Sequence, residues 1–157
     1  MKTFFQIAGI VVLAFFVITC GNRSLAQKDT AAKALAEANA SITDKYWKLI
    51  EINGKPVTSE TVAKEPFIIL KNEDQRVNGN GGCNTIFGTY EISEGNRIKF
   101  SQMATSLMAC LNMEVEDALK KALDMADNYS VSEDGKYLSL NRARMAPLAR
   151  FEVVYLK

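Results

Sequence analysis

Cys83 and Cys110 are the two residues whose type and position offer the most definite chemistry in the chain. A bridge between them would close a loop of about 27 residues, which stabilises a fold by ~3 to 4 kcal/mol on the chain-entropy account. Exported chains meet the oxidising conditions that such a bridge needs. The alternatives are two buried thiols that lie close together and a redox or metal role, which the absence of Cys-x-x-Cys spacing does not favour.

Catalytic side chains are scarce, because histidine, the commonest general base and metal ligand, is absent from the 157 residues. Thr105 and Ser106 offer hydroxyl groups, but neither a Ser-x-x-Lys motif nor another base accompanies them. Local hydrogen bonds to the backbone explain both hydroxyls. We therefore expect no catalytic residue, no cofactor and no enzymatic activity.

Three methionines, Met103, Met108 and Met113, recur at five-residue intervals and could offer soft ligands to monovalent copper. Such an interval fits neither one face of a helix nor one face of a strand. Methionine is also an adaptable filler of irregular cores. Core packing is the favoured interpretation, and no metal site is predicted.

Glu114, Glu116 and Asp117 form an acidic cluster that could suggest acid–base chemistry or a calcium site. They fall in the first turn of a predicted helix, where the macrodipole alone favours acidic side chains. The glycine-rich run 78–82 could similarly suggest a phosphate cradle, but no Gly-Lys-Ser/Thr follows and no strand-to-helix transition surrounds it. The run is therefore predicted to be a structural turn that ends in Cys83.

The charges are nearly balanced, with 19 lysine and arginine residues against 18 aspartate and glutamate residues. Nucleic acid is therefore not expected as a partner. Arg142, Arg144 and Arg150 flank the last predicted loop and could meet phospholipid headgroups or lipopolysaccharide phosphate. Ordinary solvated charges explain these arginines more simply.

Residues 1–19 have the features of a lipoprotein signal peptide. Lys2 precedes an apolar run of about a dozen residues, which is too short for the roughly 20 residues of a membrane span. Val17-Ile18-Thr19-Cys20 then resembles a bacterial lipobox, which predicts that Cys20 is lipidated. Thr19 departs from the usual small residue before the cysteine. Cleavage after Ala26, which satisfies the small-x-small rule, and an uncleaved anchor are the alternatives.

Residues 20–44 are predicted to be the lipidated cysteine and a flexible tether, because they hold too few large apolar side chains to offset the entropy of ordering. Acyl chains on Cys20 would anchor the protein to a membrane, at ~0.8 kcal/mol for each buried methylene. We therefore expect a membrane-anchored lipoprotein of the bacterial cell envelope, facing the periplasm or the cell surface. Gly21-Asn22-Arg23 after the cysteine leaves open which membrane holds it.

The folded domain is predicted to span residues 45–157. Alternating apolar residues predict a first strand around Trp47, the expected core anchor, and Asn53-Gly54 predicts a tight turn after it. A helical period predicts a helix from an N-cap at Asn112 to Asp127. The strands are expected at residues 46–52, 66–70, 75–77, 85–92, 97–100, 129–132, 137–141 and 148–156.

Short strands joined by hairpin turns, with one interrupting helix, indicate an α+β fold. We predict a curved antiparallel β-sheet or partial barrel of about seven to eight strands, with the helix plugging or flanking it. Cys83 closes the glycine-rich turn and Cys110 lies just before the helix. A contact between them would pin the helix to the sheet.

Four motifs follow one another in the chain: Trp47-Lys48-Leu49, Asn53-Gly54-Lys55-Pro56-Val57, Gly82-Cys83-Asn84 with Phe87-Gly88-Thr89-Tyr90, and Ala104-Thr105-Ser106-Leu107-Met108-Ala109-Cys110. In this order they resemble the META domain, the family of the heat-shock protein HslJ, over about residues 46–157. The resemblance implies an antiparallel sheet with a helix across it. Its motif residues are the site candidates: Gly79, Gly82, Cys83, Asn84, Gly88, Tyr90, Thr105, Met108 and Cys110.

The META resemblance implies a small bacterial envelope domain, often lipid-anchored. Members are linked with heat stress, novobiocin resistance and, in some eukaryotic parasites, secretion or motility, and none of these is a reaction. We therefore predict a non-enzymatic, monomeric envelope lipoprotein related to stress or antibiotic resistance. Its expected partners are the membrane, through the N-terminal lipid, and an envelope protein or another envelope component.

Two alternative functions stay open. A small-molecule-binding module would use the open end of the sheet and would need an apolar pocket of ~300 Å³ or more. An inhibitor of a protease or lysozyme would need a protruding ordered loop, for which residues 57–64 and 142–147 are the candidates.

Overall fold

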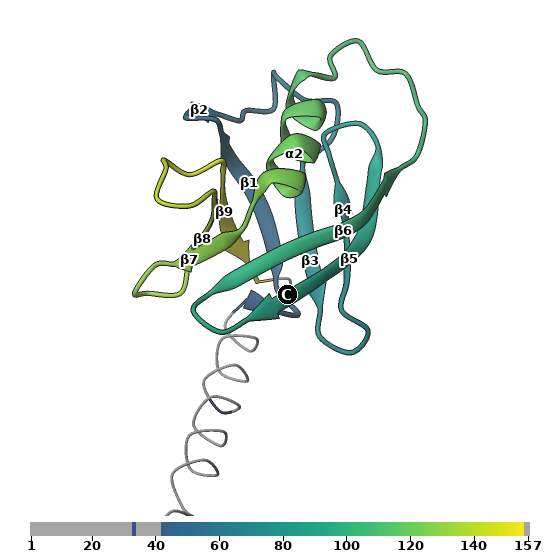
Figure 1. Ribbon diagram of the computed structural model, residues 1–157. Coiled ribbons are helices and arrows are strands. Elements are labelled where there is room, and N and C mark those ends of the chain that lie inside the picture. The colour runs from purple at the N-terminus through teal and green to yellow at the C-terminus, as the bar shows by residue number, and fades with distance from the viewer. Residues whose placement is uncertain (1–32, 34–41, 156–157) are drawn as a thin grey trace, which may run out of the picture.

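The computed structural model describes residue 33 and residues 42–155, so Cys20, the predicted signal peptide and most of the predicted tether lie outside it. Within the described residues, nine strands form one antiparallel sheet, which β1 nearly closes into a ring by pairing with both β3 and β9 (Figure 1). The predicted α+β fold is confirmed. The strands are β1 Tyr46–Ile52, β2 Lys55–Pro56, β3 Phe67–Lys71, β4 Arg76–Asn80, β5 Thr85–Ser93, β6 Arg97–Thr105, β7 Asn128–Val131, β8 Tyr137–Asn141 and β9 Ala149–Val154.

Trp47 is fully buried, as predicted for the core anchor, and its Nε1 donates a hydrogen bond of 2.8 Å to the carbonyl of Ile42. Ile42 is itself fully buried and packs in the hydrophobic core. The packed part of the chain thus includes Ile42, which the sequence assigns to the tether. A single large apolar side chain at the end of a polar run forms no periodic pattern, so the sequence gives no sign of its burial.

β4 takes in most of the glycine-rich run that the sequence predicts as a turn. Gly79 belongs in this strand because a Cβ atom on it would lie 2.1 Å from the carbonyl oxygen of Phe67 in β3. The chain leaves the strand at Gly81, and Gly82 adopts the left-handed φ of +114°. Close approach between strands, and not turn geometry, therefore explains Gly79.

β6 continues past Phe100, where the prediction ends it, to Thr105. An extra residue in β6 forms a β-bulge opposite Gly88, and Gln102 adopts a φ of 52° there. A Cβ atom on Gly88 would lie 2.5 Å from Met103 Sδ. The bulge shifts the side chains by one position, which breaks the alternating pattern and explains why the sequence predicts only the first half of the strand.

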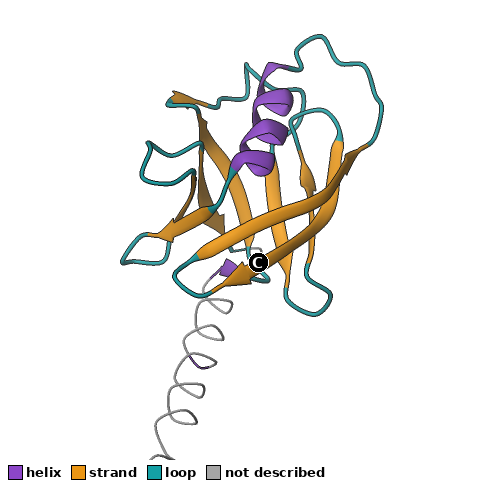
Figure 2. Ribbon diagram, viewed as in Figure 1, coloured by secondary structure: helices purple, strands orange, loops and turns teal. Residues whose placement is uncertain are grey.

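The helix α2, Glu114–Met125, lies across the sheet and contacts β6 and β1 (Figure 2). The predicted N-cap at Asn112 is wrong, because Met113 holds that position, although Asn112 Oδ1 accepts a hydrogen bond of 3.0 Å from the Glu114 amide. The helix ends before the predicted Asp127, whose amide instead bonds to the carbonyl of Asn141 at 3.0 Å. No helix in the described part of the chain has the length and apolar character needed to cross a membrane.

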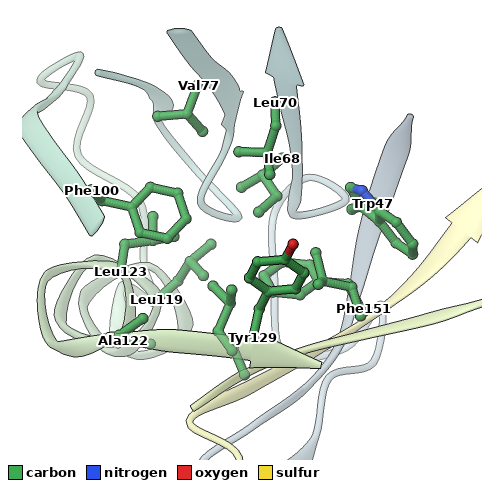
Figure 3. Packing of buried hydrophobic residues seen from close by; sticks show 14 of the residues in the cluster. Trp47, Ile68, Leu70, Val77, Phe100, Leu119, Ala122, Leu123, Tyr129 and Phe151 are labelled. Atoms are coloured by element: carbon green, nitrogen blue, oxygen red, sulfur yellow. The ribbon is translucent and has the colours of Figure 1, made fainter. Parts of the chain in front are cut away.

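Side chains from α2 and from the sheet meet in one core (Figure 3). Leu119 and Leu123 enter it from the helix, Trp47 and Phe151 enter it from β1 and β9, and all four are fully buried. In the described chain, β6 and β7 share a single residue pair, and α2 packs against β6. The interior of the sheet is therefore filled with side chains.

Candidate functional site

Asn84 is the centre of a buried hydrogen-bond network at the end of the sheet. Its Nδ2 donates to the carbonyl of Met108 at 3.1 Å and to Glu116 Oε1 at 3.0 Å. Its Oδ1 accepts from the amide of Met108 at 2.7 Å and from Ser106 Oγ at 2.8 Å. The side-chain amide has two donor and two acceptor positions, so its hydrogen-bonding capacity is used in full.

Glu116 is the partner of Asn84 on the helix and is only 2 % exposed. Its Oε2 accepts a hydrogen bond of 2.6 Å from the backbone amide of Asn84, while Oε1 accepts the bond from Asn84 Nδ2. The interpretation of Glu116 as a charge that only complements the helix dipole is therefore incomplete. Gly81 makes its burial possible, because a Cβ atom there would lie 2.6 Å from Glu116 Cγ. The carboxylate locks the helix to the β4–β5 connection.

A disulfide joins Cys83 to Cys110, with the two Cα atoms 6.2 Å apart. Cys83 is fully buried at the end of the glycine-rich turn, whereas Cys110 is partly exposed between β6 and α2. The sequence leaves open whether these two cysteines form a disulfide, two buried thiols that lie close together, or a redox or metal site. The structure contains the disulfide. The disulfide and the Asn84 hydrogen bonds both hold the β4–β5 connection, and they do so at the same end of the sheet.

We call residues 106–113, which connect β6 to α2, the tip loop. Leu107 is 97 % exposed, Leu111 is fully exposed and Met108 is 47 % exposed. No charged residue occurs between Lys99 and Glu114. The loop extends from the end of the domain opposite to the start of β1 and the end of β9 (Figure 1). Single exposed apolar side chains are common on protein surfaces, whereas three within five residues of one uncharged loop concentrate apolar surface there, which is typical of interaction sites.

The other motif residues support the structure of this end of the domain and of the neighbouring strands. The hydroxyl of Tyr90 donates a hydrogen bond of 3.0 Å to the carbonyl of Lys71. Thr105 is the last residue of β6 and pairs with Ile86. The hydroxyl of Ser106 donates a hydrogen bond of 2.8 Å to Asn84 Oδ1 and accepts one of 3.2 Å from the Thr85 amide, so its partners are distant in sequence and not the local backbone that the sequence predicts.

The methionines that the sequence analysis considered as copper ligands lie in different surroundings. Met103 packs against the core at the bulge, Met108 is half exposed on the tip loop, and Met113 caps α2. Within residues 33 and 42–155, no three His, Cys, Asp or Glu side chains are grouped so that they could hold a metal ion.

The arginines near the last loop have acidic neighbours. Arg150 Nη1 lies 3.2 Å from Glu51 Oε2, in an ion pair between β9 and β1. The pKa of Asp127 is lowered, first by a hydrogen bond from the Ala143 amide and to a smaller extent by the charge of Arg142. Arg150 and Arg142 thus do not belong to a uniform basic stripe.

A surface cleft of about 310 Å³ lies between β1 and residues 57–66. In the described chain, β1 and β3 pair only at two positions of β1, Trp47 and Lys48, and the cleft lies beside the residues that precede β3. Val57 and Val62 line its apolar part, and Lys48 and Glu65 supply charged groups. The cleft is distinct from the filled interior of the sheet.

Tyr46, Lys48 and Glu65 form a polar cluster beside this cleft. Glu65 Oε1 accepts a hydrogen bond of 3.1 Å from the Tyr46 hydroxyl, and Glu65 Oε2 lies 2.6 Å from Lys48 Nζ. The ring of Tyr46 stacks on Phe67, with the centroids 4.3 Å apart. Burial, and after it the hydrogen bond to Glu65 and the charge of Glu65, raises the pKa of Tyr46 to about 12.

We expect a near-ultraviolet absorbance titration of the Tyr46→Phe variant to lack one tyrosine that ionises near pH 12. The folded state favours the neutral phenol, so its contribution to stability is complete below the usual tyrosine pKa of about 10 and is lost as the pH rises through about 12. Glu65→Gln should lower the ionisation pH of Tyr46, because it removes the charge. The pKa of Tyr90, raised to about 12 chiefly by burial, serves as the control and should not move. An unchanged alkaline titration in Tyr46→Phe would contradict this assignment.

The comparisons with known proteins agree with this fold. The family model of the META domain matches residues 40–155. An NMR structure of a protein from Burkholderia xenovorans has a TM-score of 0.61 and 21% sequence identity, and the match covers 75% of this chain and 87% of that chain. A second NMR structure has a TM-score of 0.57 and 20% identity, with 73% of this chain and 92% of that chain covered. No curated protein matches the chain.

Proposed function

The chain belongs to the META domain family, and from this membership and the tip loop we propose that it is a non-enzymatic binding protein of the bacterial cell envelope. In this proposal the tip loop docks into an apolar groove of a partner protein. A lipid on Cys20 anchors the chain to a membrane, and the setting is envelope stress or antibiotic resistance, as the family resemblance implies.

The observation that carries the proposal is the exposure of Leu107 and Leu111 on a loop that is held in place. Burial of one leucine side chain on binding contributes ~1.5 to 3 kcal/mol. The loop is fixed at Met108 by Asn84 and at Cys110 by the disulfide, so it loses little conformational entropy when a partner binds. Two leucines presented in this way fit a concave apolar surface.

The position of the tip loop favours a protein partner over the anchoring membrane. The described chain enters the domain near the start of β1, and the tip loop lies at the other end (Figure 1). With an anchor upstream of β1, the tip loop lies at the end of the domain that is farther from the attachment point. The absence of charge between Lys99 and Glu114 favours an apolar contact over recognition of an anionic headgroup.

We expect Leu107→Ser combined with Leu111→Ser to weaken partner binding by about 10-fold or more for each leucine, because each substitution removes ~1.5 kcal/mol or more of apolar burial. The measurement is affinity capture from intact envelopes with quantitative mass spectrometry, followed by a Kd for the captured protein. Met145→Ser is the matched control, because Met145 is 66 % exposed on the loop between β8 and β9. Equal capture by the double variant and by wild type would contradict the proposal.

The cleft beside β1 favours a second candidate, a small-molecule-binding module, because its volume of about 310 Å³ reaches the lower end of the range for ligand pockets, ~300 Å³. It differs from the site expected at the open end of the sheet, where side chains fill the interior. Stabilisation by a ligand that is unaffected by the two leucine substitutions would distinguish it from docking at the tip loop.

An inhibitor of a protease or lysozyme would be one form of the leading proposal, with the enzyme cleft as the apolar groove. Of the loops expected for this role, residues 57–64 pack Val57 and Val62 against the core. Residues 142–147 are held at Ala143, whose amide bonds to Asp127, between α2 and β7, and whose carbonyl accepts a bond from Asn128 of β7. The tip loop is the better candidate, because its large side chains stay exposed.

A further inference from the structure

We propose that thiol–disulfide exchange at Cys110 switches the tip loop between a braced form and a released form. Its regulatory meaning rests on the docking function proposed above, whereas the structural switch does not. The argument combines where the loop is held, which cysteine is exposed, and what holds the rest of the domain.

The tip loop is held at successive points along the chain. Asn84 binds the amide and the carbonyl of Met108, and the side chain of Asn112 donates a hydrogen bond of 3.3 Å to the carbonyl of Thr61. Between these points, the described structure has no hydrogen bond to residues 109–111. The bridge from Cys110 to Cys83 is thus what fixes the middle of the loop and, with it, the position of Leu111.

The two cysteines differ in exposure. Cys83 is fully buried, whereas Cys110 is partly exposed and stands between two exposed neighbours, Ala109 and Leu111. In this proposal an incoming thiolate attacks Cys110 Sγ, because that residue is the exposed partner of the pair, and Cys83 Sγ is the leaving group. This direction of attack leaves the newly freed thiol inside the domain.

The exchange needs a protein dithiol as the reductant. One of its thiolates forms a bond with Cys110 Sγ as the bond to Cys83 Sγ breaks, and Cys83 leaves as a thiolate that takes up a proton. The second thiolate of the dithiol then attacks the mixed disulfide, and Cys110 leaves and is protonated. The dithiol is oxidised to a disulfide, and the Cys83–Cys110 pair is reduced to two thiols by the same two electrons.

Release should stay local because the Asn84 network contains neither sulfur. Asn84 and Glu116 continue to join the β4–β5 connection to α2, and the core beneath them is packed independently of the bridge. Once released, Leu111 no longer keeps a fixed position relative to Leu107. A partner groove must then order the loop as it binds, which weakens binding.

The test compares the full-length protein before and after reduction with dithiothreitol. NMR relaxation measures the mobility of residues 109–113, and hydrogen exchange and far-ultraviolet circular dichroism monitor the rest of the domain. We expect the order parameters of residues 109–113 to fall on reduction from about 0.85, the value of a rigid backbone, to below about 0.6, while the exchange protection of β4 and β5 and the circular dichroism stay as they were. The variant with Cys83→Ser and Cys110→Ser should match the reduced protein. Unchanged order parameters in residues 109–113, or loss of exchange protection throughout the sheet, would overturn the switch.

Two further measurements separate this proposal from the docking function. Glutathione should give a mixed disulfide on Cys110 with Cys83 free, and the opposite assignment by mass spectrometry would overturn the direction of attack. If binding of the captured partner depends on Leu107 and Leu111 and weakens about 10-fold on reduction, the regulation is supported. If binding depends on both leucines but is equal in both redox forms, the regulation alone is overturned. If binding does not depend on the leucines, the docking function is overturned.

Discussion

Glu116→Ala should lower the free energy of unfolding by ~3 to 5 kcal/mol. The substitution removes two hydrogen bonds to a carboxylate and leaves the backbone amide and the Nδ2 of Asn84 buried without this acceptor. Hydrogen bonds to charged groups contribute ~1.5 to 3 kcal/mol each, and a donor left unsatisfied costs a comparable amount. The measurement is equilibrium unfolding in urea, with the slope checked so that the two midpoints can be compared.

The chain offers matched controls for this substitution. Glu114, two positions earlier in α2, has a largely exposed side chain with only a long contact of 3.9 Å to Lys55, so Glu114→Ala should change stability by less than about 0.5 kcal/mol. Glu116→Gln should fall between the two alanine variants, because its oxygen can accept one bond while its amide nitrogen faces a second donor. Glu116→Ala with wild-type stability would show that the network does not hold the helix to the sheet.

Removal of the disulfide by Cys83→Ala and Cys110→Ala should cost ~3 to 4 kcal/mol, because the bridge closes a loop with a sequence separation of 27. Domains of this size usually have ~5 to 15 kcal/mol of stability, so the variant should remain folded. Urea unfolding of the oxidised protein, the reduced protein and the double variant checks the value. The last two should agree, and unfolding midpoints that are equal with and without the bridge would contradict the prediction.

The bridge and the Glu116 network hold the same end of the domain, so their effects should not be additive. Combining Glu116→Ala with the loss of the bridge releases α2 and the tip loop together. A double-mutant cycle should therefore show an interaction energy of ~0.5 to 3 kcal/mol. The coupling would demonstrate that the two devices stabilise one structural unit.

Most strands could be predicted because they follow local rules. The alternation around Trp47, with the Asn53-Gly54 turn after it, reproduces β1 as the structure has it. The predictions failed where a local pattern is broken by contacts with distant residues. Gly79 sits in a strand because β3 approaches it, and β6 passes through a bulge that hides its alternation.

The candidate site was only partly visible in the sequence. Asn84, Cys83 and Cys110 were found through their motifs, but the buried role of Glu116 was missed. Its place in the first turn of a helix explains an acidic residue equally well whether the side chain is exposed or buried. Nothing local marks the difference, because its partner Asn84 lies 32 residues away.

By itself the sequence determined the family, the α+β class, most of the strands and the pair of cysteines, because motifs, periodicity and residue type depend on near neighbours in the chain. Only the tertiary structure decided that Glu116 is buried against Asn84, and that Leu107 and Leu111 are left outside the core. The physical reason is that burial depends on the register and curvature of strands that are distant in sequence. The type of an apolar residue is the same whether the fold buries its side chain or leaves it exposed for a partner.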